Sequence, residues 1–216
     1  MSLVFHALRA GLFIGIILLL IGVTNVGQTP LFMAFLAALV MARFLELSGP
    51  GKALLATRLA DEDKSRITTW IIGATFITNM VVPILHYRYS KPLPEVGWWN
   101  WLGLLIMIAG SALRLWSIQV AGESFKAQIA VSAKHRLATS GPYAWVRHPA
   151  YLGTIIFYLG VTAIFWSSWG LAALLIVVVP TFVVRLFKEE RILEAHFGEE
   201  WRRYAAQTGS MLFPGL

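Results

Sequence analysis

The sequence predicts an all-α, polytopic integral membrane protein with about six apolar helices. Three observations predict this class: 57% of the 216 residues are hydrophobic, only 13% are charged, and several long stretches carry no charged side chain. Soluble domains have about a quarter charged residues, so the low charge indicates a membrane protein. We expect a single membrane domain over residues 1–216, with N-terminal helices in 1–109 and a catalytic, cofactor-binding half in 110–216.

The first half of the chain predicts four membrane helices. One crossing takes about 20 apolar residues, so the uncharged run 10–42 is long enough for two helices. Turn-forming residues at 24–30 divide this run, and we interpret 1–23 as a retained first helix rather than a cleaved signal peptide. A third helix is expected over 67–87 and a fourth over 96–113.

The second half predicts a helical hairpin followed by a charged tail. Residues 149–184 are uncharged and twice as long as one crossing requires, and the Ser-Ser-Trp-Gly segment at 167–170 divides them into two helices. Pro180 is expected to kink the second of these helices, because proline cannot make the backbone hydrogen bond of a helix interior.

The distribution of lysine and arginine predicts that both termini lie on the cytoplasmic side. With the N-terminus inside, the outer loops hold only Arg88 and Lys91, and the inner segments hold nearly all other basic residues. The polar region around 114–148 and the tail 185–216 then flank the same hairpin on the cytoplasmic side and can meet in space. The net charge of +7 follows from this asymmetry, so we expect no nucleic-acid partner.

One run of 13 residues, 141–153, concentrates polar and aromatic side chains where the inner loop meets the fifth helix. Pro149 suits the first turn of a helix, and the backbone N–H groups after it form an anion site. Arg147 and His148 stand beside that site, and two tyrosines flank them. The pattern predicts a ligand with a carboxylate or phosphate. The alternative is that Arg147 only anchors the helix flank and the tyrosines form an interfacial belt.

A second candidate cluster lies where the sixth helix leaves the membrane. Glu189 and Glu190 are about 100° apart on a helix, so only one of them can face a given pocket fully. The alternative is a solvated helix face on which Arg185 pairs with Glu189. Aromatic residues at 197, 201 and 204 predict an amphipathic helix on the membrane interface, with packing favoured over capping of the pocket.

Motifs for metal, nucleotide and thiol chemistry are missing from the sequence. The chain contains no cysteine, which excludes disulfides, thiolate catalysis and cysteine metal sites. The histidines and glutamates have no spacing typical of a metal site, and there is no GxSxG elbow, P-loop or GxGxxG. We therefore expect no metal.

The second half of the chain resembles the isoprenylcysteine carboxyl methyltransferase family and its phospholipid methyltransferase relatives. The resemblance covers roughly 110–197 and lies in Ala112-Leu113-Arg114, Gly122 with Phe125, His135-x-Leu137, Gly141-Pro142-Tyr143, Arg147-His148-Pro149-x-Tyr151-x-Gly153, Glu189-Glu190 and Phe197-Gly198. It implies a small membrane enzyme that uses S-adenosyl-L-methionine and releases S-adenosyl-L-homocysteine. It also implies a cytoplasmic cofactor site formed by the loop before the fifth helix and the C-terminal tail.

Carried over residue by residue, the resemblance implies roles for particular side chains. Cofactor binding is implied for His135, Leu137, Gly141, Tyr143, His148, Tyr151, Glu189 and Glu190. Arg147 and Glu190 are the candidate catalytic residues, with Glu190 as the base if the acceptor is an amine. A carboxylate acceptor needs alignment and exclusion of water rather than a base.

The implied methyl acceptor is lipophilic, such as an isoprenoid, a prenylcysteine-like compound or a phospholipid, and would enter from the bilayer. Members of the family often have an arginine shortly before the final proline, and residues 208–214 lack one. The identity of the acceptor therefore does not transfer. The compact chain predicts a prokaryotic inner or plasma membrane and no obligate protein partner.

Two other functions compete with methyl transfer. Sterol and steroid reductases carry a related His-Pro-x-Tyr box and use NADPH, but their box usually reads His-Pro-Asn-Tyr with an acid after the glycine. Here Ala150 and Thr154 occupy those positions, which favours methyl transfer. A non-catalytic transporter or scaffold predicts polar residues within the spans, whereas these spans are nearly free of charge.

Overall fold

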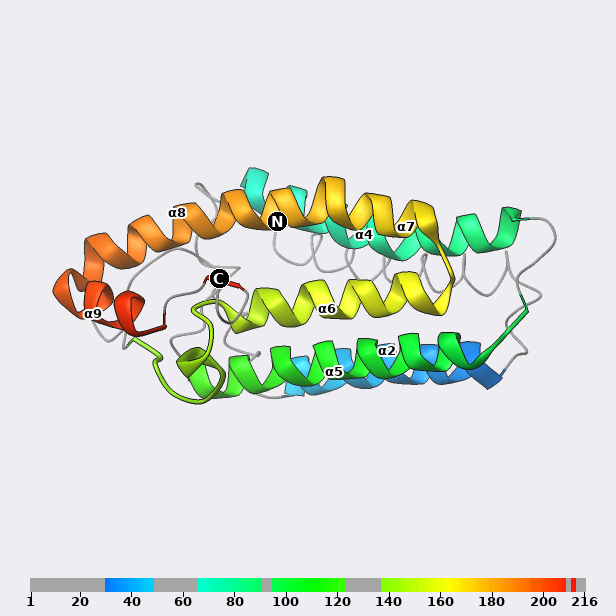
Figure 1. The fold of residues 1–216 in the computed structure, drawn as a ribbon, viewed down its shortest axis with the longest axis horizontal. Helices are drawn as coiled ribbons and strands as arrows, with labels where there is room; N and C mark the ends of the chain where they lie inside the picture. Colours follow the sequence, from blue (N-terminus) through cyan, green and yellow to red (C-terminus); the bar gives the residue numbers. More distant parts are fainter. Residues whose placement is uncertain (1–29, 49–65, 91–94, 123–136, 209–210, 213–216) are drawn as a thin grey trace.

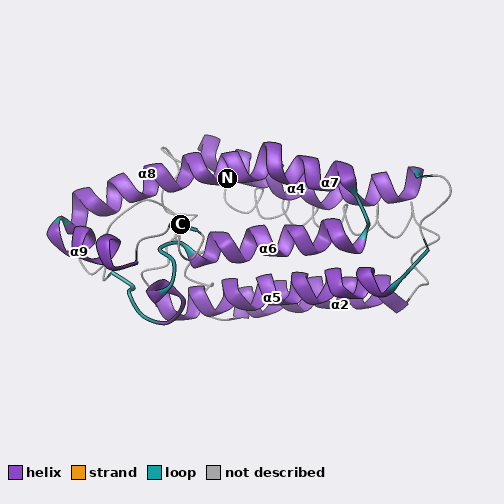
Figure 2. Cartoon of the chain, in the orientation of Figure 1, coloured by secondary structure: helices purple, strands orange, loops and turns teal. Residues whose placement is uncertain are grey.

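A computed structural model describes residues 30–48, 66–90, 95–122, 137–208 and 211–212, and the regular elements in these residues are all helical (Figure 1, Figure 2). They are α2 (Pro30–Ser48), α4 (Arg66–Tyr89), α5 (Trp98–Ala121), a 3₁₀ turn η3 (Gly141–Ala144), α6 (Pro149–Ile164), α7 (Ser168–Ala173), a π-helical segment η4 (Leu174–Val178), α8 (Val179–Phe197) and α9 (Glu199–Thr208). In Figure 1, α6 lies between α5 and α2 on one side and α8 and α4 on the other. The 13-residue motif therefore leads into the central helix.

Helix α5 is longer than the sequence predicts. It runs to Ala121, whereas the expected span ends at 113, just before the charge of Arg114. The guanidinium of Arg114 stays between the helices, where its Nη1 donates to the hydroxyl of Thr154 on α6 at 3.2 Å. A charge that bonds to a neighbouring helix does not have to end its own helix. The first expected helix, within 1–29, lies outside the described residues.

The turn of the C-terminal hairpin comes earlier than predicted. It lies between the end of α6 at Ile164 and the start of α7 at Ser168, rather than at 167–170. Ser167 is the N-cap of α7, and its hydroxyl accepts a hydrogen bond from the backbone N–H of Gly170 at 2.9 Å. The residues expected to form the turn therefore form the first helical turn of α7.

Helices α7 and α8 form one continuous run, from Ser168 to Phe197, through the π-helical segment. The backbone N–H of Val179 donates to the carbonyl of Leu174, five residues earlier, just before Pro180. Because proline lacks an N–H and its ring crowds the carbonyl four residues before it, a wider turn at this point accommodates Pro180. The helix continues past it and carries its charged end beyond the apolar part.

Four glycines allow α5 and α6 to pack backbone against backbone. Gly103 and Gly110 lie seven residues apart on α5, and Gly153 and Gly160 have the same spacing on α6. A Cβ atom on Gly110 would lie 2.4 Å from the backbone nitrogen of Phe157. Close approach through small residues is a common way for membrane helices to associate. The start of α6, and the motif before it, are thereby held against α5.

The outward faces of α5 and of the run through α7 and η4 are apolar. Helix α5 and the run Ser168–Phe197 are long and apolar enough to cross a membrane. Leu105 on α5 and Ile176 in η4 are 63% and 73% exposed. Exposed tryptophans stand near both ends of α5, at Trp98 and Trp116, which is the placement typical of the two membrane interfaces. These faces suit contact with lipid.

Candidate active site

The 13-residue motif folds into a tight turn that leads directly into α6. Gly141 has a φ of +59°, a value that favours glycine, and it begins the 3₁₀ turn η3. Pro149 is the first residue of α6, as predicted, and His148 precedes it as the N-cap. This arrangement places Arg147 and His148 at the start of α6, within ion-pair distance of Glu190 on α8.

Arg147, His148 and Glu190 form an ion-pair cluster between α6 and α8. Nε of Arg147 donates to Oε1 of Glu190 at 2.7 Å, and Nη2 donates to Oε2 at 3.3 Å. Nε2 of His148 lies 3.1 Å from the same Oε1. The side chains of Arg147 and His148 are 10% and 4% exposed, and that of Glu190 is 17% exposed. A two-pronged pair shielded from water is the stronger kind of ion pair.

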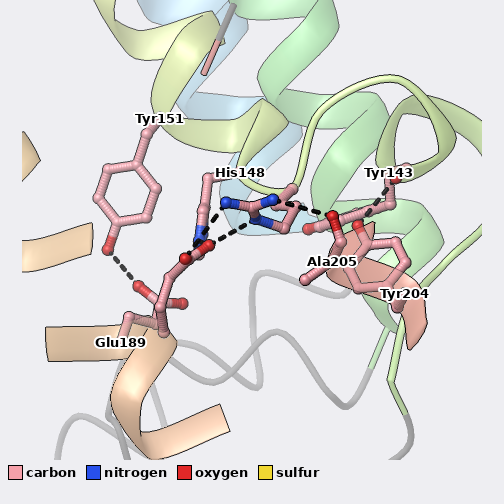
Figure 3. Close-up of polar contacts among 8 residues, drawn as sticks. Tyr143, His148, Tyr151, Glu189, Tyr204 and Ala205 are labelled. Carbon is pink, nitrogen blue, oxygen red and sulfur yellow. Dashed lines mark hydrogen bonds and ion pairs between the residues drawn. The ribbon is translucent and has the colours of Figure 1, made fainter. Parts of the chain in front are cut away.

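Glu189, the neighbouring residue, faces a different partner. Its Oε2 accepts a hydrogen bond from the hydroxyl of Tyr151 at 2.9 Å (Figure 3). Nε of Arg185 donates to the same hydroxyl. The ring of Tyr151 packs edge-on against Phe182, with the ring centroids 5.4 Å apart. The two glutamates therefore meet two different groups of residues, as their angular separation on the helix requires.

Helix α9 packs over η3. The hydroxyl of Tyr204 donates to the backbone carbonyl of Tyr143 at 2.8 Å. Trp201 and Tyr204 are both buried within the protein. Trp201 and Tyr204 therefore pack against the protein, and the position of this helix on the membrane interface stays a prediction.

Arg147 and His148 also bind the backbone of the C-terminal segment. Nη1 of Arg147 donates to the carbonyl of Ala205 at 3.2 Å, and the backbone N–H of His148 donates to the carbonyl of Met211 at 3.1 Å. Because one guanidinium binds both Glu190 and the backbone of α9, Arg147 links the start of α6 to α8 and to α9.

At the start of α6, the protein's own groups occupy part of the anion site that the sequence predicts, and the site stays a prediction. The backbone N–H groups of Tyr151 and Leu152 donate to the carbonyl of His148 at 3.1 and 3.2 Å. The side chains of Arg147 and His148 face Glu190. An anionic ligand at this position would have to replace that carboxylate.

The ionisable groups of the site have different electrostatic surroundings. Glu190 lies on the charged extension of α8, where burial favours its neutral form, but hydrogen bonds from His148 and Arg147 outweigh burial and lower its pKa. Burial raises the pKa of Tyr143, and the negative charge of Glu189 adds to the effect. At neutral pH, Glu190 is therefore ionised and Tyr143 protonated.

The remaining predicted residues contribute backbone and packing rather than polar groups. Leu137 is half-buried ahead of η3. Gly141 supplies the backbone conformation of the turn, and a Cβ there would lie 3.1 Å from the side chain of Val120. His135 lies outside the described residues. Within the described part of the chain, no group of three His, Cys, Asp or Glu side chains is placed to hold a metal ion.

Two arginines at the site have contacts that sequence reasoning missed. Arg185 contacts Tyr151, and Arg114 donates to Thr154 at 3.2 Å in the first turns of α6. Arg185 lies four residues before Glu189, which puts both on one helix face. This spacing is the signal in the sequence that Arg185 and Glu189 share surroundings, but it predicts an ion pair between the two on one helix rather than a contact of Arg185 with Tyr151. Nothing in the sequence marks Arg114 as a partner of Thr154.

Tyr204→Phe is expected to make the protein less sensitive to alkali. Burial raises the pKa of Tyr204 from 10.0 to about 12. The stability that its neutral form contributes is therefore complete below pH 10 and is lost as the pH rises through about 12. At neutral pH the variant lacks the hydrogen bond to Tyr143 and should be less stable by about 1 kcal/mol.

That deficit should shrink as the pH rises above the ordinary phenol pKa of about 10. The measurement is thermal unfolding of both proteins from neutral to strongly alkaline pH. Tyr89→Phe is the matched control, because Tyr89 is 73% exposed. A deficit for Tyr204→Phe that stays constant over the whole range would contradict the prediction.

Comparison with known proteins identifies isoprenylcysteine methyltransferases as relatives. A family model, described as the isoprenylcysteine carboxyl methyltransferase family, matches residues 101–195. The protein-S-isoprenylcysteine O-methyltransferase of Tribolium castaneum is 30% identical over 136 residues, which cover 62% of this chain and 48% of the insect protein. Protein-S-isoprenylcysteine O-methyltransferase A of Arabidopsis thaliana is 33% identical over 163 residues, which cover 73% of this chain and 83% of the plant protein.

Among solved structures, the eukaryotic intramembrane Ras methyltransferase is similar to this chain. The match covers 100% of this chain and 92% of the other, with 20% sequence identity and a TM-score of 0.43. The chain thus spans about half the length of the insect relative and most of the plant relative.

Proposed function

The chain belongs to the isoprenylcysteine carboxyl methyltransferase family, a family of integral membrane methyltransferases, and on that premise we propose a specific reaction. The protein transfers a methyl group from S-adenosylmethionine to the carboxylate of a lipophilic, prenylcysteine-like acceptor. The relatives are named for this kind of acceptor. The competing assignment, an NADPH-dependent reductase, has no support from the comparisons.

The proposal depends mainly on the hydrogen bond between Tyr151 and Glu189 at the end of the membrane hairpin, with Tyr143 on the other side of His148 (Figure 3). S-adenosylmethionine presents a sulfonium, an ammonium and ribose hydroxyls, which aromatic faces and carboxylate oxygens bind. Glu189 offers such an oxygen, because within the described residues its Oε1 makes no hydrogen bond and only Oε2 is engaged. The residues present therefore fit this cofactor.

When bound, S-adenosylmethionine would supply a methyl group that the acceptor carboxylate takes in an in-line displacement, in which a C–O bond forms and the C–S bond breaks. The contribution of the chain is alignment and exclusion of water. The buried Trp201 and Tyr204 of α9 shield one side of the site, and the shielded Arg147–Glu190 pair holds α9 in place.

Glu190 does not suit the role of a general base. Both of its oxygens accept hydrogen bonds, from Arg147 and His148, and these bonds lower its pKa. An efficient base at neutral pH has a raised pKa and an accessible oxygen. A carboxylate acceptor is already an anion and needs no base, so this geometry favours methyl ester formation over methylation of an amine.

The orientation in the membrane completes the proposal. The site lies at the charged end of α8, which the distribution of basic residues assigns to the cytoplasm together with both termini. A lipophilic acceptor would reach it from the bilayer along the apolar outer faces of α5 and of the run through α7 and η4. A prokaryotic membrane remains a prediction from the compactness of the chain, since the relatives described above come from an insect and a plant.

S-adenosylhomocysteine is expected to raise the thermal unfolding temperature of the detergent-solubilised protein, and NADPH is expected to leave it unchanged. A ligand present at 100 times its Kd stabilises the folded state by about 2.7 kcal/mol. The same preparation should transfer a labelled methyl group from S-adenosylmethionine to a farnesylated cysteine with a free carboxylate.

The matched control for the acceptor is the carboxamide of the same farnesylated cysteine, which offers no carboxylate nucleophile and should receive no label. A thermal shift with NADPH and none with S-adenosylhomocysteine would overturn the proposal. Equal labelling of the carboxylate and the carboxamide would exclude the ester as product.

A further inference from the structure

Helix α8 has two faces with different surroundings. One face carries Arg185, Glu189 and Glu190, whose side chains contact residues at the start of α6. At 100° per residue, the opposite face, about 180° away around the helix, is made by Val184, Phe187, Lys188 and Arg191. All four of these residues are exposed, and we call this surface the outer face of α8.

The outer face changes from apolar to basic where the helix has become long enough to span a bilayer. The continuous helical run begins at Ser168, and its 20 residues up to Phe187 have a length of about 30 Å, the thickness of the hydrocarbon core. Within this length Ile176, Val184 and Phe187 are each more than half exposed. Lys188, the next residue, is the first cation of the outer face. Its charge therefore lies at the level of the lipid headgroups.

Within the part of the chain that the structure describes, no carboxylate pairs with Lys188 or Arg191. Glu194 lies three residues after Arg191, at a spacing that favours an ion pair. Its Oε1 instead accepts from Nε of Arg202 on α9 at 3.0 Å. Glu190 lies on the opposite face, in the ion-pair cluster of the candidate site. The two positive charges of the outer face are therefore available to an anion.

We infer that Lys188 and Arg191 bind the headgroup of an anionic phospholipid, such as phosphatidylglycerol, while Val184 and Phe187 contact its acyl chains. Two cations favour an anion, and the apolar side chains that precede them favour an anion attached to acyl chains over a free phosphate or an acidic protein segment. Attraction to anionic lipid is worth about 1 kcal/mol, or about fivefold in affinity, for each cation near the membrane surface.

The position of this lipid site also concerns the candidate active site. Arg185 and Glu189 lie on the other face of the same helical turns, where they contact the hydroxyl of Tyr151. A headgroup held by Lys188 and Arg191 thus sets the height of these residues relative to the membrane surface. The lipid site itself depends on charge and depth alone, and it does not require methyl transfer.

Native mass spectrometry of the detergent-solubilised protein, titrated with one lipid at a time, tests the inference. Dioleoylphosphatidylglycerol should bind the wild type at least about fivefold more tightly than dioleoylphosphatidylcholine, which has the same chains and no net charge. Lys188→Gln/Arg191→Gln should reduce this preference to within about twofold. Raising the ammonium acetate concentration from about 0.1 M to about 1 M should weaken the preference of the wild type, since the Debye length falls from about 10 Å to about 3 Å.

Arg203→Gln is the matched control for the single variants Lys188→Gln and Arg191→Gln. It removes one exposed cation from α9, outside the outer face of α8. Its preference for phosphatidylglycerol should stay at the wild-type value, whereas each single variant on α8 should lose part of it. The unfolding temperatures of all these variants in detergent without added lipid should match that of the wild type, because the changed side chains are exposed.

The following outcomes would overturn the inference: equal binding of the two lipids to the wild type, or the same loss of preference in Arg203→Gln as in Lys188→Gln. Displacement of the bound lipid by inorganic phosphate or by a polyglutamate peptide, at equal charge concentration, would assign the two cations to a different anion. If the double variant does not fold, a wild-type preference that salt leaves unchanged would be decisive against it. None of these measurements uses S-adenosylmethionine, so they fail or succeed separately from the proposed function.

Discussion

Gly110→Leu is expected to separate α5 from α6 and to destabilise the protein by at least about 3 kcal/mol, which corresponds to roughly 6–12 °C in unfolding temperature for a chain of this size. The physical reason is the backbone contact at this point. The first carbon of any side chain on Gly110 would lie 2.4 Å from the nitrogen of Phe157 and 2.6 Å from the carbonyl oxygen of Gly153. Backbone atoms cannot rotate away as a flexible side chain can, so the helices themselves must move.

The matched control for this variant is Ala112→Leu, which introduces the same side chain two residues later on an exposed face of α5. It should change the unfolding temperature by no more than a degree or two. Gly110→Ala should fall between Ala112→Leu and Gly110→Leu, since one carbon already meets the backbone of α6. Scanning fluorescence of the detergent-solubilised proteins measures all three. Similar unfolding temperatures for the two leucine variants would show that α5 and α6 are not in close backbone contact.

The Gly110 contact shows how much of the fold the sequence predicts. Apolar length and turn residues place α2, α4, α6 and the start of α5 within a few residues, because a bilayer imposes those lengths. The pairing of α5 with α6 was missed, although its signal is present as glycines seven residues apart in both helices. A spacing within each helix does not reveal which two helices meet. The proposed boundary between 1–109 and 110–216 stays a prediction, but the ring of Phe35 meets that of Phe165 at 5.3 Å, so one core joins both parts.

The candidate site was predicted as a set of residues but not as a set of contacts. The sequence places Tyr143, His148 and Tyr151 in one motif and the two glutamates in another, and the structure brings the motifs together. The sequence does not predict that Glu190 pairs with Arg147 and His148, the two cations expected to bind an anionic ligand. Spacing along one helix favours an ion pair between Arg185 and Glu189. The packing of α8 against α6 instead brings the hydroxyl of Tyr151 within hydrogen-bond distance of Arg185.

Removal of Arg147 and Glu190 together is expected to cost much less stability than the sum of the two single changes. Arg147→Met keeps the apolar stem and leaves the carboxylate of Glu190, 17% exposed, with His148 as its remaining partner. Removal of one partner of a buried pair costs about 3–5 kcal/mol, mainly because the other charge stays without compensation. Because this pair is only largely buried, we expect about 2–3 kcal/mol for each single change.

The double variant Arg147→Met/Glu190→Gln removes both charges, so no uncompensated charge remains at the site. We expect it to cost about 3 kcal/mol, which gives a coupling energy of about 1–3 kcal/mol between the two positions. Unfolding temperatures of the wild type, the two single variants and the double variant complete the cycle. Additive costs, within about 0.5 kcal/mol, would mean that Arg147 acts through its bond to the carbonyl of Ala205 rather than through Glu190. Strong coupling would instead identify the Arg147–Glu190 ion pair as the interaction through which the charged end of α8 holds α9 in place.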